Sequence, residues 1–319
     1  TRTFIEWVAA YTLAPLGTVL KLAMSVPAAL VAPKPHTRYA LSGSIPARMT
    51  DARRRVLDIA ANGPPMTAAD LARAAMVSNS VIRALADAGI LLSAALPPAP
   101  PFAVPDSELA AVALSPMQSE VAAALSAKVA ARVFSVTLLD GVTGSGKTEV
   151  YMDAVAEALR QRRQSLVLVP EIALTRQWLE RFRRRFGVSP AEWHSELSAS
   201  QRRVTWRAIA DGTARVVVGA RSALFLPYPA LGLLVIDEEH DASYKQEEGI
   251  IYNARDMAVV RARIGAVPAV LVSATPSLET VANVQTGRYE RLHLADRHGS
   301  AGLPAIEVID LRTEVLGRG

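Results

Sequence analysis

Residues 141–148 read Gly-Val-Thr-Gly-Ser-Gly-Lys-Thr, which is a complete G-x-x-x-x-G-K-[ST] phosphate loop. The loop follows an apolar, strand-like run and precedes a helix-like run that begins at Glu149. In this order the glycines let the backbone approach an anion, and the N–H groups at the start of the helix point at its phosphates. The expected phosphate contacts are Gly141, Val142, Thr143, Gly144, Ser145, Gly146, Lys147 and Thr148.

Two acidic residues follow another apolar run, Leu233-Leu-Val-Ile236. An aspartate at the end of such a strand can hold Mg²⁺, while the next carboxylate orients or deprotonates the attacking water. We therefore expect Asp237 and the Thr148 hydroxyl to hold Mg²⁺. Lys147 is expected to reach the β- and γ-phosphates, and Glu238 is the expected general base.

From about residue 112 the sequence alternates helical stretches with short apolar runs. The expected strands are Phe134–Asp140, Leu166–Val169, Val216–Gly219, Leu231–Asp237 and Ala269–Ser273. This alternation is typical of an α/β domain with a parallel sheet covered on both faces, whose ligands bind beyond the carboxyl ends of the strands. The phosphate loop, Asp237 and Ser273 all fall at such ends, so we expect them to meet at one edge.

The first 111 residues divide into shorter pieces. Residues 1–26 have helical spacing that Pro15 interrupts, and the proline-containing stretches 27–47 and 97–111 are expected to be linkers. Residues 48–96 predict helices at 51–61, 68–75 and 80–87, followed by an apolar run at 90–92. This order suggests a small, mostly helical winged-helix domain that reads DNA. A packing or protein-contact module of the same shape is the alternative.

Composition limits the remaining possibilities. The net charge is +5, and 30 of the 35 positive residues are arginines, which favour bidentate contact with phosphate; a solvated basic surface is the alternative. Cysteine is absent, so these residues cannot form a disulfide or a cysteine-bound zinc site. No membrane span is expected. Trp178 is expected in the core or as amphipathic cover, and residues 181–185 are expected on a solvated helix face, with phosphate contact as the alternative.

Several stretches together resemble a superfamily 2 helicase motor and, more particularly, the PriA family of replication-restart helicases. They are residues 141–151, 169–175, 219–225, 237–240 and 273–276. Residues 237–249, read as Asp-Glu-Glu-His-Asp-Ala-Ser-Tyr-Lys-Gln-Glu-Glu-Gly, are the most specific to that family, together with residues 252–256. The resemblance implies a RecA-like motor domain over residues 112–319 that uses ATP and Mg²⁺. It makes residues 1–26 the end of a domain that binds the 3′ end of DNA.

The same resemblance assigns further residues. Gln118, in Leu-Ser-Pro-Met-Gln, would read the adenine of the nucleotide, and His240 would link hydrolysis to DNA. Arg221 and Ser222 would face single-stranded DNA. The other DNA-binding or coupling residues would be Tyr244, Lys245, Tyr252, Arg255, Ser273 and Thr275. Rings and cations together suit base stacking and phosphate contact. For Ser273 and Thr275, capping of the next helix is the alternative.

The implied activity is that of an ATP-dependent 3′→5′ DNA helicase or translocase, which recognises stalled or branched replication forks and initiates primosome assembly. The implied partners are forked and single-stranded DNA, single-stranded-DNA-binding protein and other primosome proteins, in the cytoplasm near the nucleoid. The second motor lobe, its arginine finger and the family's zinc-binding cysteines are expected outside this chain, which should therefore bind ATP without unwinding DNA.

Two alternatives stay open at this point. The family has an aromatic and a basic residue where Ile250 and Ile251 stand here, which weakens stacking and favours a primosome-loading platform with little helicase activity. The other alternative is a regulator in which a helix-turn-helix is joined to a nucleotide-sensing ATPase. Sequence-specific binding to duplex DNA would identify such a regulator.

Overall fold

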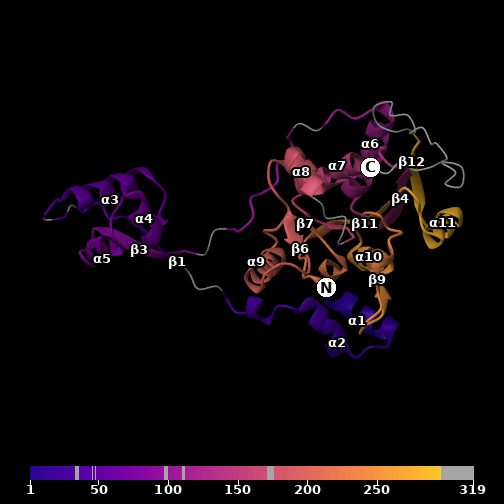
Figure 1. Ribbon diagram of the computed structural model, residues 1–319, viewed down its shortest axis with the longest axis horizontal. Helices are drawn as coiled ribbons and strands as arrows, with labels where there is room; N and C mark the ends of the chain where they lie inside the picture. The colour runs from indigo at the N-terminus through magenta and orange to yellow at the C-terminus, as the bar shows by residue number, and fades with distance from the viewer. Residues whose placement is uncertain are drawn as a thin grey trace, which may run out of the picture. The chain divides into compact units, whose positions relative to one another are not determined.

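The computed structural model describes residues 1–32, 36–44, 46, 48–96, 100–109, 112–170 and 176–295 (Figure 1). The chain forms two compact units. One unit joins Thr1–Pro27 to the chain from Phe102 onward, and the other is Ala28–Pro101. Each unit has its own apolar core, and the phosphate loop belongs to the larger one.

The smaller unit packs three helices on an antiparallel sheet of strand order β2-β1-β3. Its elements are β1 (His36–Leu41), α3 (Asp51–Asn62), β2 (Met66–Thr67), α4 (Ala68–Ala74), α5 (Asn79–Asp87) and β3 (Leu91–Leu96). The three helices agree with the sequence, since the hydroxyls of Thr50 and Thr67 cap α3 and α4. The identity of this unit as a winged helix stays a prediction.

β1 corrects the expectation that residues 27–47 form a linker. His36–Leu41 pair along their full length with Leu91–Leu96, so this stretch is an integral part of the smaller unit. The physical reason is that Pro33, Pro35 and Pro46 flank the strand without interrupting it, and a flanking proline does not remove a donor from the ladder.

The larger unit is built on a seven-stranded, fully parallel sheet of order β12-β4-β11-β8-β5-β7-β6. Its strands are β4 (Ser135–Gly141), β5 (Gln164–Leu168), β6 (Ala191–Trp193), β7 (Val216–Gly219), β8 (Leu231–Ile236), β11 (Pro268–Ser273) and β12 (Glu290–Leu294). The five expected strands are present within one or two residues at each end. The short edge strands β6 and β12 were not predicted, because each is brief and has exposed or polar positions.

Helices cover both faces of this sheet, as the alternation predicted. Its helices are α6 (Pro116–Ala131), α7 (Lys147–Arg160), α8 (Arg176–Phe186), α9 (Ala199–Ala210), η3 (Arg221–Phe225), η4 (Ala242–Tyr244), α10 (Ala254–Gly265) and α11 (Leu278–Gln285). One face packs against α6, α7 and α8, which share a core with alternate residues of β5, β7 and β8. On the other side, α10 contacts β8 and β11, and η3 contacts β5 and β7. The expectation of a RecA-like α/β domain is confirmed.

The two N-terminal helices, α1 (Arg2–Thr12) and α2 (Leu16–Ala23), belong to the larger unit. The predicted break at Pro15 lies between them. Phe4 packs on Phe225 with ring centroids 5.4 Å apart, and the Trp206 Nε1–H donates to the Ala23 carbonyl oxygen at 2.8 Å. A short helix, η1 (Pro27–Ala29), follows. Throughout the described residues, no helix is both long and apolar enough to cross a membrane.

Candidate functional site

A cavity of about 450 Å³ opens where β4, β8 and β11 end, and we call it the phosphate-loop cavity. Its walls are Thr143, Gly144, Gly146, Lys147, Thr148, Gln177, Trp178, Arg181, Asp237, Glu238 and Ala274. The expected meeting of the phosphate loop, Asp237 and the residues after β11 at one sheet edge is therefore observed. Because β4, β11 and β8 are neighbours in the sheet, segments about 90 and 130 residues apart in sequence are brought together.

The phosphate loop is held in a shape that needs glycine. Gly144 and Gly146 have φ angles of +83° and +81°, a region that costs side-chain-bearing residues energy. A Cβ atom on Gly146 would also lie only 2.5 Å from Nε2 of Gln118. The helix α7 begins directly after the loop, so its N-terminal N–H groups add to an anion-binding cradle.

The ammonium group of Lys147, which is the only positive charge in the phosphate loop, lies inside this cradle. The Lys147 ammonium donates to the carbonyl oxygens of Gly141 and Val142, at 2.8 and 3.1 Å. Burial lowers the pKa of Lys147, while Glu238, Asp237 and Asp140 act in the opposite direction. A largely buried ammonium beside helix N–H groups gives the cavity the chemistry of a polyphosphate site.

Asp237 follows β8 and is fixed from several sides. Its Oδ2 accepts a hydrogen bond from the Tyr151 hydroxyl at 2.8 Å, and its Oδ1 accepts one from the backbone N–H of Glu238 at 3.1 Å. Its own carbonyl oxygen accepts the hydroxyl of Tyr244 at 2.6 Å. Burial raises the pKa of Asp237 to about 6, while the Tyr151 hydrogen bond opposes that rise. The two hydrogen bonds to its oxygens thus orient the carboxyl group.

The oxygen atoms of Thr148 and Asp237 on the wall of one cavity fit Mg²⁺, which prefers oxygen ligands and is bound through one or two carboxylates together with substrate phosphates. Glu238 lines the same cavity and is partly exposed. Its backbone has a φ of +48°, which is strained for a residue with a side chain. Such strain is characteristic of functional positions, and here it accompanies the expected general base.

Gln118 corrects one expectation. Its side chain is only 5% exposed, and both ends of its amide are engaged within the protein. Oε1 accepts the N–H of Ser115 at 2.8 Å, which completes a capping box at the start of α6, and Nε2 donates to the Ser145 carbonyl oxygen at 2.9 Å. In this arrangement Gln118 supports the phosphate loop, and its amide is not presented to an adenine ring.

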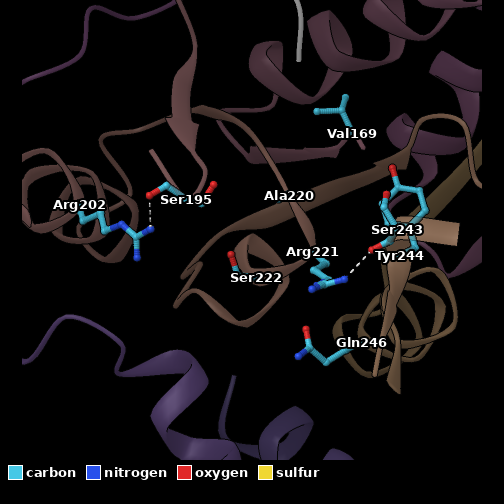
Figure 2. A pocket seen from close by; sticks show the side chains of 9 residues that line it. All are labelled: Val169, Ser195, Arg202, Ala220, Arg221, Ser222, Ser243, Tyr244 and Gln246. Atoms are coloured by element: carbon cyan, nitrogen blue, oxygen red, sulfur yellow. Dashed lines mark hydrogen bonds between the residues drawn. The ribbon is translucent and has the colours of Figure 1, made fainter. Parts of the chain in front are cut away.

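A second cavity of about 260 Å³ lies at the same sheet edge, where β5, β6 and β7 end (Figure 2). Its lining residues are Val169, Ser195, Arg202, Ala220, Arg221, Ser222, Ser243, Tyr244 and Gln246, and we call it the arginine groove. Arg221 donates to the carbonyl oxygens of Ser243 and Lys245, at 2.8 and 3.0 Å. Arg202 donates to those of His194 and Ser195, at 3.1 and 2.9 Å. Each guanidinium has five N–H donors in all, and these contacts use one terminal nitrogen of each.

The expected aromatic loop differs from its prediction. Tyr244 and Tyr252 are 1% and 6% exposed, and Tyr252 packs edge-on against Phe225 at 5.3 Å. The expectation that these rings stack on bases is therefore not met, because Tyr252 is buried and Tyr244, although it lines the arginine groove, is almost fully buried. Lys245 is exposed and pairs with Glu247 on the hairpin β9 (Lys245–Gln246) and β10 (Tyr252–Asn253).

Arg255 is also buried, so it is not available for phosphate. Its Nη1 lies 3.3 Å from Glu239 Oε2 and 2.6 Å from Ser277 Oγ. Glu239 is 1% exposed and accepts three further hydrogen bonds, from the Ser277 N–H, the Ser277 hydroxyl and the Thr280 hydroxyl, at 2.8 to 3.0 Å. This buried ion pair joins the acidic motif to the end of the hairpin and to α11.

His240 and Ser273 are brought together, as a coupling role requires. Their Nδ1 and Oγ atoms are 2.8 Å apart, and the same Oγ accepts the N–H of Thr275 at 2.9 Å. Ser222 accepts the indole N–H of Trp193 at 3.2 Å on the wall of the arginine groove. The contact between His240 and Ser273 thus links the segment after β8 to the end of β11.

Some residues of these cavities were not found from the sequence. Trp178 and Arg181 line the phosphate-loop cavity, although we expected the first in the core or as amphipathic cover and the second on a solvated face, with phosphate contact only as the alternative. Trp178 is in fact both buried and on the cavity wall. Ser195, Arg202 and Gln246 of the arginine groove were not predicted either. Tyr151 stands four residues after Lys147, and this i, i+4 spacing is the signal that would have placed it on the same helix face.

Comparison with known proteins agrees with this geometry. Residues 115–284 match the model of the DEAD/DEAH box helicase family. The replication restart protein PriA of Rickettsia felis is 49% identical over 57% of this chain and 28% of its own length. That of Chlamydia pneumoniae is 37% identical over 97% of this chain and 43% of its own length. The chain thus spans less than half of each of these relatives.

RecG bound to a three-way DNA junction aligns with a TM-score of 0.45 and 21% identity, over 59% of this chain and 24% of RecG. The family match covers both the phosphate loop and the acidic motif after β8. The resemblance to PriA inferred from the motifs is confirmed by relatives that bear that name. The chain belongs to the DEAD/DEAH box helicase family.

Proposed function

We propose that the protein containing this chain is an ATP-dependent 3′→5′ DNA helicase or translocase that recognises stalled or branched replication forks and initiates primosome assembly. The observation that carries the motor part is that Asp237 lines one cavity and is hydrogen-bonded to a residue that lines the other. Its carboxylate lines the phosphate-loop cavity, and its carbonyl oxygen accepts the hydroxyl of Tyr244, which lines the arginine groove.

The nucleotide side follows from the chain's own residues. The loop N–H groups and Lys147 bind and orient the phosphates, and Thr148 and Asp237 would hold Mg²⁺. Bound Mg²⁺ neutralises charge that develops on the phosphate oxygens. Glu238 lines the same cavity, at a position from which it can orient a water and accept its proton. The use of ATP and Mg²⁺ is typical of the family to which the chain belongs.

The DNA side rests on the arginine groove. Its polar groups include two guanidiniums, three serine hydroxyls and an amide, which suit a sugar-phosphate backbone better than a base. Arg221 holds the carbonyl oxygens on both sides of Tyr244. A strand that draws Arg221 toward its phosphate would therefore change the restraint on Tyr244 and, through its hydroxyl, on Asp237. We assign coupling to this route and to the His240–Ser273 contact.

Several parts of this proposal come from resemblance to the replication restart proteins. They are the 3′→5′ direction of movement, fork recognition, the binding of a 3′ end beside residues 1–26, the zinc outside this chain and the primosome partners. The same holds for single-stranded-DNA-binding protein as a partner and for a place near the nucleoid. One specific observation favours the alternative of a primosome-loading platform. The rings of Tyr244 and Tyr252 are buried while Ile251 is 64% exposed, so the loop has few stacking surfaces.

One experiment separates these proposals. ATP turnover and strand separation by the full-length protein are measured on a forked duplex and on unrelated linear duplexes, at one stated salt concentration. Fork-stimulated turnover with unwinding supports the helicase. Tight fork binding without turnover identifies the platform, and preference for one linear sequence identifies a regulator.

A further inference from the structure

The buried hydroxyl of Tyr151 lies at the back of the phosphate-loop cavity, and the motifs gave it no role. Tyr151 is fully buried on the first turns of α7. Its hydroxyl accepts the indole N–H of Trp178 at 2.7 Å and donates to Asp237 Oδ2 at 2.8 Å. The side chain of Thr148 also interacts with this hydroxyl. One phenol thus contacts both residues that would hold Mg²⁺.

The chemistry of the three groups fixes the direction of the hydrogen bonds. An indole N–H can only donate, so Trp178 occupies an acceptor position of the phenol. The phenol has one proton, and the carboxylate of Asp237 accepts it. Trp178 is itself held by stacking on Phe182, with ring centroids 5.7 Å apart. The hydrogen bonds therefore run in one direction, from Trp178 to Tyr151 to Asp237, and the Trp178 ring that begins the series is held in place.

We propose that Tyr151 is a positioning residue, which holds the Asp237 carboxylate in the orientation that binds the divalent metal ion. The N–H of Glu238 occupies one site on Oδ1, and Tyr151 occupies one on Oδ2. Each carboxylate oxygen has about two lone-pair sites, so both oxygens keep one for the metal or its water. Partners of this kind orient metal ligands, and their loss costs about 10- to 100-fold in metal affinity.

The proposal rests on the proposed nucleotide site but does not depend on any action on DNA. The test is Tyr151→Phe in the full-length protein, which removes the hydroxyl and keeps the ring. Tyr228→Phe is the matched control, because Tyr228 is also buried and its hydroxyl donates to the Ala223 carbonyl oxygen. Mn²⁺ serves as a probe of the metal site, and its binding in the presence of ADP is followed by electron paramagnetic resonance without turnover.

We expect Tyr151→Phe to weaken Mn²⁺ binding about 10-fold or more. The Mg²⁺ concentration for half-maximal ATPase activity should rise by a similar factor, with little change in the KM for ATP at saturating Mg²⁺. Tyr228→Phe should change neither quantity. Wild-type Mn²⁺ affinity in a folded Tyr151→Phe variant would overturn the proposal.

A second variant keeps the proposal testable if Tyr151→Phe does not fold. Trp178→Phe preserves an aromatic ring beside Phe182 and the Tyr151 hydroxyl, but it removes the indole donor. It should weaken Mn²⁺ binding by a smaller factor than Tyr151→Phe, and an unchanged affinity would count against the relay. If Mn²⁺ does not bind with ADP even to the wild-type protein, the proposed nucleotide site itself is wrong.

Discussion

The two cavities at the sheet edge are built in different ways. The phosphate-loop cavity takes eight of its eleven lining residues from the segments that follow β4, β8 and β11, including the first turn of α7, and the other three, Gln177, Trp178 and Arg181, from α8. The arginine groove also begins at strand ends, but it takes Arg202 from α9 and Ser243, Tyr244 and Gln246 from the segment between β8 and α10. The residues that would bind phosphate and Mg²⁺ are therefore fixed by the sheet and by the start of α7, whereas the arginine groove depends on packing between separate segments.

This difference has a functional meaning. A catalytic geometry needs atoms held to within a fraction of an ångström, and strand ends provide that rigidity. A surface that follows a moving strand needs elements that can change their contacts. Asp237 belongs to the first region through its carboxylate and touches the second through its carbonyl oxygen. The following predictions test whether the two regions are separable in this way.

The largest effect is expected at Glu238. Glu238→Gln keeps the size of the side chain but removes the base, so ATP turnover by the full-length protein should fall about 10²- to 10⁴-fold. Nucleotide affinity, measured by equilibrium titration, should change little because Lys147 and the loop remain. Glu247→Gln on the exposed hairpin is the control. Turnover close to wild type in Glu238→Gln would remove Glu238 from the reaction.

The ion pair between the regions is expected to matter for stability. Glu239→Ala leaves Arg255 buried without its carboxylate, so the free energy of unfolding should fall by about 3–5 kcal/mol. Glu279→Ala removes an exposed carboxylate 3.6 Å from the same arginine, and it should cost no more than about 1 kcal/mol. Urea unfolding of the two variants gives the comparison. Equal losses would show that burial of Glu239 is not the cause.

The arginine groove should control DNA affinity without controlling nucleotide affinity. Arg221→Ala and Arg202→Ala should each weaken binding of single-stranded DNA about 10-fold, uniformly across sequences, and lower the salt dependence by about one phosphate contact. Fluorescence anisotropy over a series of salt concentrations measures both quantities, with Arg215→Ala as a surface control. A loss of ATP affinity in the two groove variants would show that the two regions do not act separately.

The smallest effect is expected at the hairpin. Ile251 is 64% exposed, and Ile251→Trp would add the stacking surface that the buried tyrosines do not offer. One base–aromatic stack contributes about 1–3 kcal/mol, so single-stranded DNA should bind at least about fivefold more tightly. Leu278→Trp, at an exposed position on α11, controls for added apolar surface. A similar gain in both variants would argue against a role for the hairpin.

The same contrast explains what could be predicted from the sequence. The five main strands and the edge where Lys147, Asp237 and Ser273 meet follow from apolar runs and from the rule for parallel sheets, so they were found. The orientations of Tyr244, Tyr252 and Arg255 depend on which partner each side chain meets after folding. Phe225 lies 27 residues before Tyr252, and Glu239 lies 16 residues before Arg255, so no local pattern connects them.

Gln118 illustrates a different limit. Its motif assigned it to the adenine of the nucleotide, but the capping box of α6 and the Ser145 carbonyl oxygen use its amide. A motif specifies which residue is present, whereas the competing hydrogen bonds decide what the residue does. In the same way, β1 was missed because its neighbouring prolines resembled a linker, and only its pairing with β3 identifies it as a strand.

The left-handed backbone conformation of Glu238 affects the folding free energy of this domain. A residue with a side chain in that region costs about 1–2 kcal/mol relative to an ordinary conformation, and glycine would remove most of that cost. A protein that served only as a scaffold would gain folding free energy by accepting glycine there. Glu238 therefore keeps a conformational cost that glycine would largely avoid, at the position where we propose the general base.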